Sequence, residues 1–226
     1  LEEAAREESQ LHERNVAVSE FDEARMRSER AATELRETER GERLNAQQLE
    51  QLARELADLA KEALRNKDIG TKDVEQWAAL AAAMRALAQG GMTQTAGSLQ
   101  QAQQGEANRA EDLKRALELQ REVLRELARM GGDANRASES LAARNFVNRL
   151  REAARRQGDI SGAVGTDLVK LAGMEPDRMP EEARATIDHL AGRQQANARE
   201  VGYVRDDLAG FFNRTRKQVY EEVHKE

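Results

Sequence analysis

The first 175 residues of this 226-residue chain contain no proline, the residue that most often ends or kinks an α-helix. Apolar residues in this region recur at alternating steps of three and four. The clearest runs are Leu49, Leu52, Leu56, Leu59 and Ala63, and then Val74, Trp77, Ala81, Met84 and Ala88. Such spacing gives each helix one apolar stripe that must be buried against another helix. The chain is therefore predicted to be all-α, an elongated bundle of long antiparallel helices.

The composition agrees with thin helical packing. Charged residues make up 35% of the chain, apolar residues 39% and aromatic residues 3%. Ala, Leu, Glu, Arg and Gln, the strong helix formers, are abundant. Because few aromatic side chains are present, Ala and Leu must supply most of the buried area, which favours helices with a high ratio of surface to core.

The N-terminal part differs from the rest in its apolar stripe. Residues 1–66 are predicted to form one helix. Residues 1–40, however, carry 12 acidic residues, 7 arginines and few apolar residues, and the strong apolar stripe begins only at Leu44. Gly41 is the expected weak point between the two halves. The sequence therefore predicts a charged helical coiled-coil arm at 1–43 and a helical bundle at 44–226.

Glycine pairs and prolines divide the predicted bundle. Gly90-Gly91 and Gly131-Gly132 are expected to stop helices, and Pro180 is expected to start the last one. The expected stripe of that last helix is Ile187, Leu190, Gln194, Ala198, Val201, Val204, Leu208, Phe212, Thr215 and Val219. The predicted helices are at about 44–66, 72–89, 108–130, 138–157, 160–172 and 180–226.

Charge limits the partners. A net charge of −6 argues against nucleic acid, since phosphate binding needs a cationic surface. Residues 136–157 nevertheless hold six arginines against two glutamates, with Arg149, Arg151 and Arg155 among them. These arginines are interpreted first as solvated or mutually complementary faces, and an anionic ligand on this helix is the alternative.

No catalytic, cofactor or metal site is predicted, so the chain is not expected to be an enzyme. Cysteine is absent, and His12, His189 and His224 are isolated from one another. The single Glu-x-x-His pair, Glu221 with His224, lacks the second pair that a di-iron bundle uses. Phosphate loops, EF-hand loops and nucleophile elbows are missing, and the longest apolar run, 78–84, is too short to span a membrane.

The few aromatic residues are the candidate interaction positions. Phe21 lies in the charged arm, whereas Trp77 falls on an apolar stripe and is expected in the core. Phe211 and Phe212 are adjacent, and so about 100° apart around a helix. One of them can pack internally while the other meets a partner. Together with Arg149, Arg151 and Arg155, these four aromatics complete the set of candidate interaction residues.

The run from Glu200 through Val-Gly-Tyr-Val-Arg-Asp-Asp-Leu-Ala-Gly-Phe-Phe-Asn-Arg to Thr215, continuing with Lys217-Gln-Val-Tyr220, resembles a segment in large, uncharacterised bacterial coiled-coil proteins. These are often membrane-anchored proteins of the planctomycete and verrucomicrobial kind, and the region from Leu49 to Met130 is similar to them as well. The resemblance implies an envelope-associated scaffold with no catalytic residues. Without it, a cytoplasmic location is expected.

The leading functional hypothesis is a structural or interaction module, part of a longer protein, that acts in scaffolding or self-association. Its partners would be protein, either a second copy or flanking coiled coil, and it would form a homo-oligomer. The alternative hypothesis is a binding module that accepts a partner helix, or an anionic ligand near the helix that runs from Arg144 to Arg156.

Overall fold

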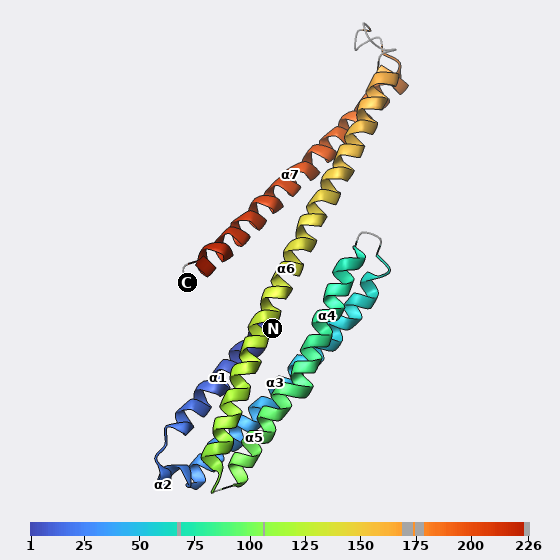
Figure 1. The fold of residues 1–226 in the computed structure, drawn as a ribbon. Coiled ribbons are helices and arrows are strands. Elements are labelled where there is room, and N and C mark those ends of the chain that lie inside the picture. The colour runs from blue at the N-terminus through green and yellow to red at the C-terminus, as the bar shows by residue number, and fades with distance from the viewer. Residues whose placement is uncertain (67–68, 106, 169–173, 175–178, 224–226) are drawn as a thin grey trace. The chain divides into compact units, whose positions relative to one another are not determined.

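The computed structural model describes the backbone of residues 1–66, 69–105, 107–168, 174 and 179–223, and their side chains except at 167–168 and 216–223. The described residues form helices and short connections without a strand, so the predicted all-α helical bundle is confirmed (Figure 1). The chain divides into two compact units, which we call unit 1 (Leu1–Leu141) and unit 2 (Ala142–Glu226).

Unit 1 begins with a reversal of the chain. Helix α1 (Glu2–Ser19) is followed by the short α2 (Glu23–Met26) and by α3 (Glu29–Ala63). Capping side chains start the second and third helices, because Asp22 Oδ1 accepts from Arg25 N at 2.8 Å and Ser28 Oγ accepts from Ala31 N at 3.3 Å. The prediction of one helix over 1–66 was therefore wrong.

The predicted arm at 1–43 is also corrected, since its boundary with 44–226 falls inside α3. Helix α1 instead packs antiparallel on α3. Asn45 of α3 donates to the main-chain oxygen of Ala4, while Arg14 pairs with Glu34 and Glu37 at the other end of the contact. The two halves of the expected long helix thus cover each other.

Gly41 is a packing position and not a weak point. A Cβ atom at this position would lie 2.5 Å from Leu11 Cδ2, so the missing side chain is what lets α1 approach α3 this closely.

The next helix contains a π-helical turn. Helix α4 (Thr71–Leu87), the π-helical η1 (Ala88–Met92) and α5 (Thr93–Gln104) follow one another without a break. The predicted stop at Gly90-Gly91 was wrong. A Cβ at Gly91 would lie 3.1 Å from Val123 Cγ2, so this glycine also permits a close approach, here by α6.

Helix α6 (Arg109–Ala163) is likewise continuous through the expected stop at Gly131-Gly132. The helices predicted at 108–130 and 138–157 are therefore one helix. The residues on both sides of the glycine pair include many strong helix formers, namely Ala, Arg, Glu and Leu. Two glycines in so long a run lower the stability of the helix but do not end it.

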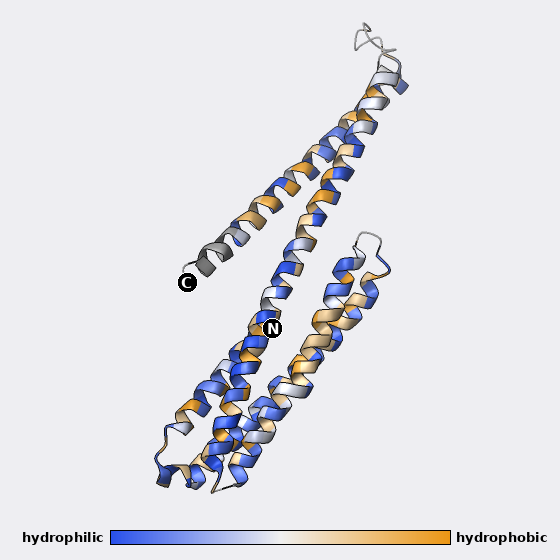
Figure 2. Ribbon diagram, in the orientation of Figure 1, coloured by the Kyte–Doolittle hydropathy of each residue, from blue (hydrophilic) through white to orange (hydrophobic). Residues whose placement is uncertain are grey.

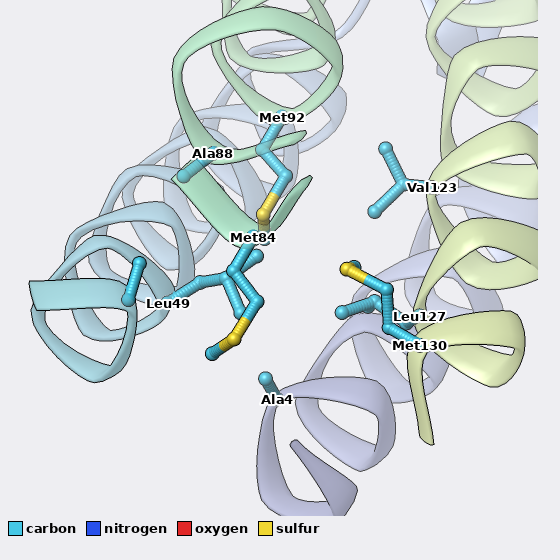
Figure 3. Packing of buried hydrophobic residues seen from close by; sticks show 9 residues of the cluster. Ala4, Leu49, Met84, Ala88, Met92, Val123, Leu127 and Met130 are labelled. Carbon is cyan, nitrogen blue, oxygen red and sulfur yellow. The ribbon is translucent and has the colours of Figure 1, made fainter. Parts of the chain in front are cut away.

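Three apolar clusters form the core of unit 1. The first joins α1, α3, α4, η1 and α6, and Figure 3 shows Met84, Met92 and Met130 pointing into the space between their helices. Its buried members are Ala4, Leu49, Ala53, Met84, Ala88, Met92, Val123, Leu127 and Met130. The second cluster is built around Leu35, Leu99 and Leu113, and the third around Ala60, Ala63 and Val74. The flexible methionines fill gaps that alanine leaves between helices.

Unit 2 is a helical hairpin. It consists of residues 142–163 of α6, the π-helical η2 (Val164–Leu168) and α7 (Glu181–Val223). The helix predicted at 160–172 is therefore not separate: residues 160–163 end α6, 164–168 form η2, and 169–172 lie outside the described residues. The last helix was predicted at 180–226, and α7 confirms it apart from 224–226, which also lie outside them.

Candidate functional site

The seam of the hairpin contains few buried side chains. Phe146 of α6 meets Phe211 of α7 edge to face, with ring centroids 5.6 Å apart. The buried residues, which recur at steps of seven, are Ala153 and Ile160 on α6, and Leu190, Asn197 and Val204 on α7. Two helices share this narrow strip, so most of the surface of each one faces away from it.

Polar contacts fix the register of the hairpin. Arg149 of α6 donates from Nε to Glu200 at 2.9 Å and from Nη1 to Asp207 at 2.8 Å, and these hydrogen bonds raise the pKa of Arg149. Asn197 donates from Nδ2 to the main-chain oxygen of Ala153 at 3.1 Å. Because the residue number falls along α6 as it rises along α7, the two helices are antiparallel.

The structure separates the two adjacent phenylalanines. Phe211 is half-buried in the seam, whereas Phe212 is 61% exposed. On α7, Val201 is displaced from the seam in the same rotational direction as Phe212, and on α6 Leu150 and Val147 are displaced in that direction as well. Their exposed fractions are 42%, 42% and 45% respectively. The expected stripe of the last helix thus runs beside the seam and only partly within it.

These displaced residues lie on one face of the hairpin. In an antiparallel pair, positions displaced from the seam in the same rotational sense face the same side. We call this surface the hairpin apolar face and define it as Val147, Leu150, Val201, Leu208 and Phe212. Figure 2 shows apolar residues recurring along both helices of unit 2.

The opposite face of the hairpin is polar. Tyr203 lies nine residues before Phe212, which places it about 180° away around α7. Its neighbours on that side include Arg199 and Asp206, and Glu152 lies on the same side of α6. Tyr203 is also 61% exposed, so the two faces differ in the residues around their exposed aromatic rings.

The other candidate interaction residues lie in varied surroundings. Trp77 and Phe21 are half-buried, and they pack against the third and second clusters of unit 1. Trp77 thus packs at the edge of the third cluster and is not a fully buried core residue. Arg151 and Arg155 are exposed, and Arg155 lies 4.0 Å from Glu152. Since Arg149 also pairs with carboxylates, internal ion pairs account for part of the arginine-rich helix.

Unit 1 contains a buried polar layer that sequence reasoning did not identify. The buried stripe of α1 is Ala4, Glu8, Leu11, Asn15 and Val18, with the same steps of four and three that leucines show elsewhere. We define the polar layer as Glu8 and Asn15 of α1, Glu42 and Asn45 of α3, and Gln120 of α6. None of these side chains is more than 1% exposed.

Carboxamides supply the donors inside the polar layer. Asn45 Nδ2 donates to Glu8 Oε2 at 3.1 Å, and Gln120 Nε2 donates to Glu42 Oε1. Gln120 Oε1 in turn accepts from Asn15 Nδ2 at 3.1 Å, and His12 Nδ1 lies 3.4 Å from the same oxygen. Each carboxyl group therefore has a neutral donor, and the layer ties three helices together.

Burial changes the acidity of both carboxyl groups. It raises the pKa of Glu8 from 4.5 to about 7, although hydrogen bonds with Glu42 and Asn45 oppose this effect. Burial, together with the charge of Glu8, raises the pKa of Glu42 well above its ordinary value. An acid and a base in a catalytic pair need a reacting molecule beside them, and none of the described cavities is lined by either glutamate.

One groove of unit 1 lies between α4 and α6. It has a volume of about 360 Å³, with Leu80, Ala83 and Met130 in its lining. Arg129, Asp133 and Arg136 also line it, but they form ion pairs with one another. Arg129 also pairs with Glu126, so carboxylates of α6 compensate both arginines.

The described residues contain neither a cluster suited to a metal ion nor a helix suited to a membrane. No cluster of three or more His, Asp or Glu side chains there is arranged to hold a metal ion. No helix in the same part of the chain is long and apolar enough to cross a bilayer. No family model, curated protein or solved structure matches the chain.

Proposed function

We propose that the chain is a structural interaction module that associates through the hairpin apolar face, with a second copy as its partner. The observation that carries this proposal is the exposure of large apolar side chains on the same face of both hairpin helices. Exposed apolar side chains that gather on one face are typical of protein–protein contacts, because their removal from water is favourable.

Helical bundles offer a simple geometry for this association. Two antiparallel hairpins that place their apolar faces together form a four-helix bundle, in which each helix gains a second packed side. Of the five buried seam residues, Ile160 and Leu190 are large and apolar, whereas Ala153 and Asn197 are small or polar, so a second layer would add apolar area to a thin seam. The matching exposed residues of two copies would supply that layer.

The test compares two exposed aromatic residues on opposite faces. Light scattering and sedimentation velocity on the 226-residue chain should give the mass of a dimer, twice the 25.3 kDa of one chain. Phe212→Lys, and more strongly Leu150→Lys with Val201→Lys, should shift the mass to that of the monomer. Tyr203→Lys is the matched control, because Tyr203 is equally exposed and lies on the polar face.

Circular dichroism of each variant establishes that the helices remain. A wild-type mass of 25.3 kDa at every concentration would overturn self-association. Equal dissociation by Phe212→Lys and Tyr203→Lys would overturn the assignment of the contact to the apolar face. Equal retention of the oligomer in all variants would place the contact elsewhere on the chain.

A further inference from the structure

The second unusual feature of the molecule is that two carboxyl groups meet in the core of unit 1. Glu8 and Glu42 are both 0% exposed, and the two carboxyl groups lie close enough for each to shift the pKa of the other. An ionised carboxylate only accepts hydrogen bonds, so two carboxylates make this contact only when one of them carries a proton.

The remaining oxygens point to the same conclusion. Glu8 Oε1 and Glu42 Oε2 are buried and receive no hydrogen bond from the N–H and O–H donors of the described residues. Asn45 Nδ2 donates to Glu8 Oε2 and Gln120 Nε2 donates to Glu42 Oε1, and neither amide donates to the remaining two oxygens. A proton on either carboxyl makes that group a donor to the other, whereas two ionised groups would leave both oxygens without a protein donor in a buried core.

The side chains around Glu8 and Glu42 carry little positive charge that could stabilise two ionised carboxylates without the proton. Besides Glu8, the titratable group of α1 near the layer is His12, which approaches the oxygen of Gln120. On α3 the neighbouring acid is Glu39, which pairs with Arg43, and Arg43 also donates to Gln100 of α5. On α6 the layer contains the neutral Gln120, whose charged neighbours Glu118 and Arg121 are exposed.

We propose that Glu8 and Glu42 share one proton, and that this proton acts as a latch that holds α1 on α3 and α6 and releases it at alkaline pH. The latch controls α1 in particular, because two of the five residues in the buried stripe of α1 are polar and a third is Ala4. Helix α3, by contrast, is also held by Leu35 and Leu49 in the two large clusters.

The direction of the pH effect follows from the acidity of the pair. The pKa of Glu8 is about 7 when α1 is docked, against the ordinary 4.5 once α1 is exposed to water. The docked form therefore binds more protons than the undocked form between these values. Docking is fully favoured below about pH 4.5 and is lost as the pH rises through about 7, and the raised pKa of Glu42 acts in the same direction.

Amide hydrogen exchange on the full 226-residue chain measures docking directly. Between about pH 5 and about pH 9, protection of the α1 amides, corrected for intrinsic exchange, should fall on the order of a hundredfold. Amides of α5 and α6 in unit 1 should keep their protection over this range. Uniform loss across unit 1 would overturn the latch, as would α1 protection that does not change with pH.

Two variants separate the shared proton from other pH effects. Glu42→Gln supplies a permanent N–H donor to Glu8, so α1 should stay protected at both ends of the pH range. Glu39→Gln is the matched control on the same helix and should behave like the wild type. A wild-type pH dependence in Glu42→Gln would overturn the proposal.

A titration of the wild-type chain needs no variant at all. The side-chain carboxyl ¹³C signals of two glutamates should titrate far above the ordinary range for this residue, and their titration should coincide with the loss of α1 protection. Ordinary titration of every glutamate would overturn the proposal, even if Glu42→Gln fails to fold.

Discussion

Gln120 of unit 1 has no exposed surface, whereas Phe212 of unit 2 is 61% exposed. The first is a polar residue enclosed by three helices, and the second is an aromatic residue on a two-helix hairpin. Burial in this protein therefore follows the number of helices that meet at a position more closely than the polarity of the residue. Unit 1 must satisfy the hydrogen bonds of what it encloses, and unit 2 is left with apolar surface that it does not enclose.

The largest expected contrast is between two leucines. Leu49→Ala in unit 1 should lower the free energy of unfolding by about 2–5 kcal/mol, because Leu49 is fully buried and its removal leaves a cavity. Leu150→Ala should cost less than about 0.5 kcal/mol in the monomer, since Leu150 is 42% exposed. Urea unfolding followed by circular dichroism measures both.

A large cost for Leu150→Ala would change the comparison. It would mean that the hairpin apolar face is covered in solution under the conditions of the measurement. The concentration dependence of that cost would then show whether a second copy covers it.

A smaller contrast is expected between two buried asparagines. Asn45→Leu should destabilise unit 1 by about 1–3 kcal/mol, because it removes a donor from the buried carboxyl of Glu8. Asn197→Leu should cost under about 1 kcal/mol, since its Nδ2 donates to a main-chain oxygen and to Gln157, and an apolar side chain suits the seam. Similar costs for both variants in urea unfolding would contradict this distinction between the polar layer and the hairpin seam.

The smallest contrast concerns two helical glycines. Gly158→Ala in unit 2 should stabilise the chain by about 0.5–1 kcal/mol, because its Cβ enters open space and alanine favours the helix. Gly91→Ala in unit 1 should lose that gain, since its Cβ would lie 3.1 Å from Val123 Cγ2 and 3.2 Å from Leu87 Cδ1. The thermal unfolding midpoint should therefore rise for Gly158→Ala and should not rise for Gly91→Ala. An equal rise in both would show that α6 and η1 yield easily at their contact.

Helix formation was predictable from the sequence because it depends on local composition. Absence of proline and abundance of helix formers act at every position, so the all-α class followed from them. The predicted helix stops at the glycine pairs were wrong because they too relied on local composition alone. Gly91 instead provides room for Val123, which lies on another helix. A contact of this kind leaves no signal in the local sequence.

The buried polar layer could not be predicted from the spacing of apolar residues alone. Glu8 and Asn15 occupy stripe positions of α1, and Glu42 and Asn45 do so on α3, but their polarity made the stripe look thin. Extending the steps of three and four through Ala4, Leu11 and Val18 would have located the first two. Their pairing with Gln120 could not be found that way, because it depends on which helices meet.

The sequence also indicated that Phe211 and Phe212 lie in different surroundings, since adjacent helical residues diverge by about 100°. It could not say which of them faces inward. Asn197 and Arg149 decide that point, because their contacts across the hairpin set the rotation of α7 against α6.

The π-helical turn at Ala88–Met92 has a consequence for how the chain tolerates changes in length. A π turn contains one residue more than an α turn, so it shifts the phase of every side chain that follows. A single-residue insertion or deletion in an uninterrupted helix turns the remaining residues away from their partners by about 100°. Residues 88–92 already hold such an offset, with α4 and α5 both in contact with α3 on either side of it. Loss of one residue there would convert the turn to α-helix and leave α5 facing the same side of the bundle, whereas the same loss elsewhere in α4 or α5 would turn the following residues away from α3.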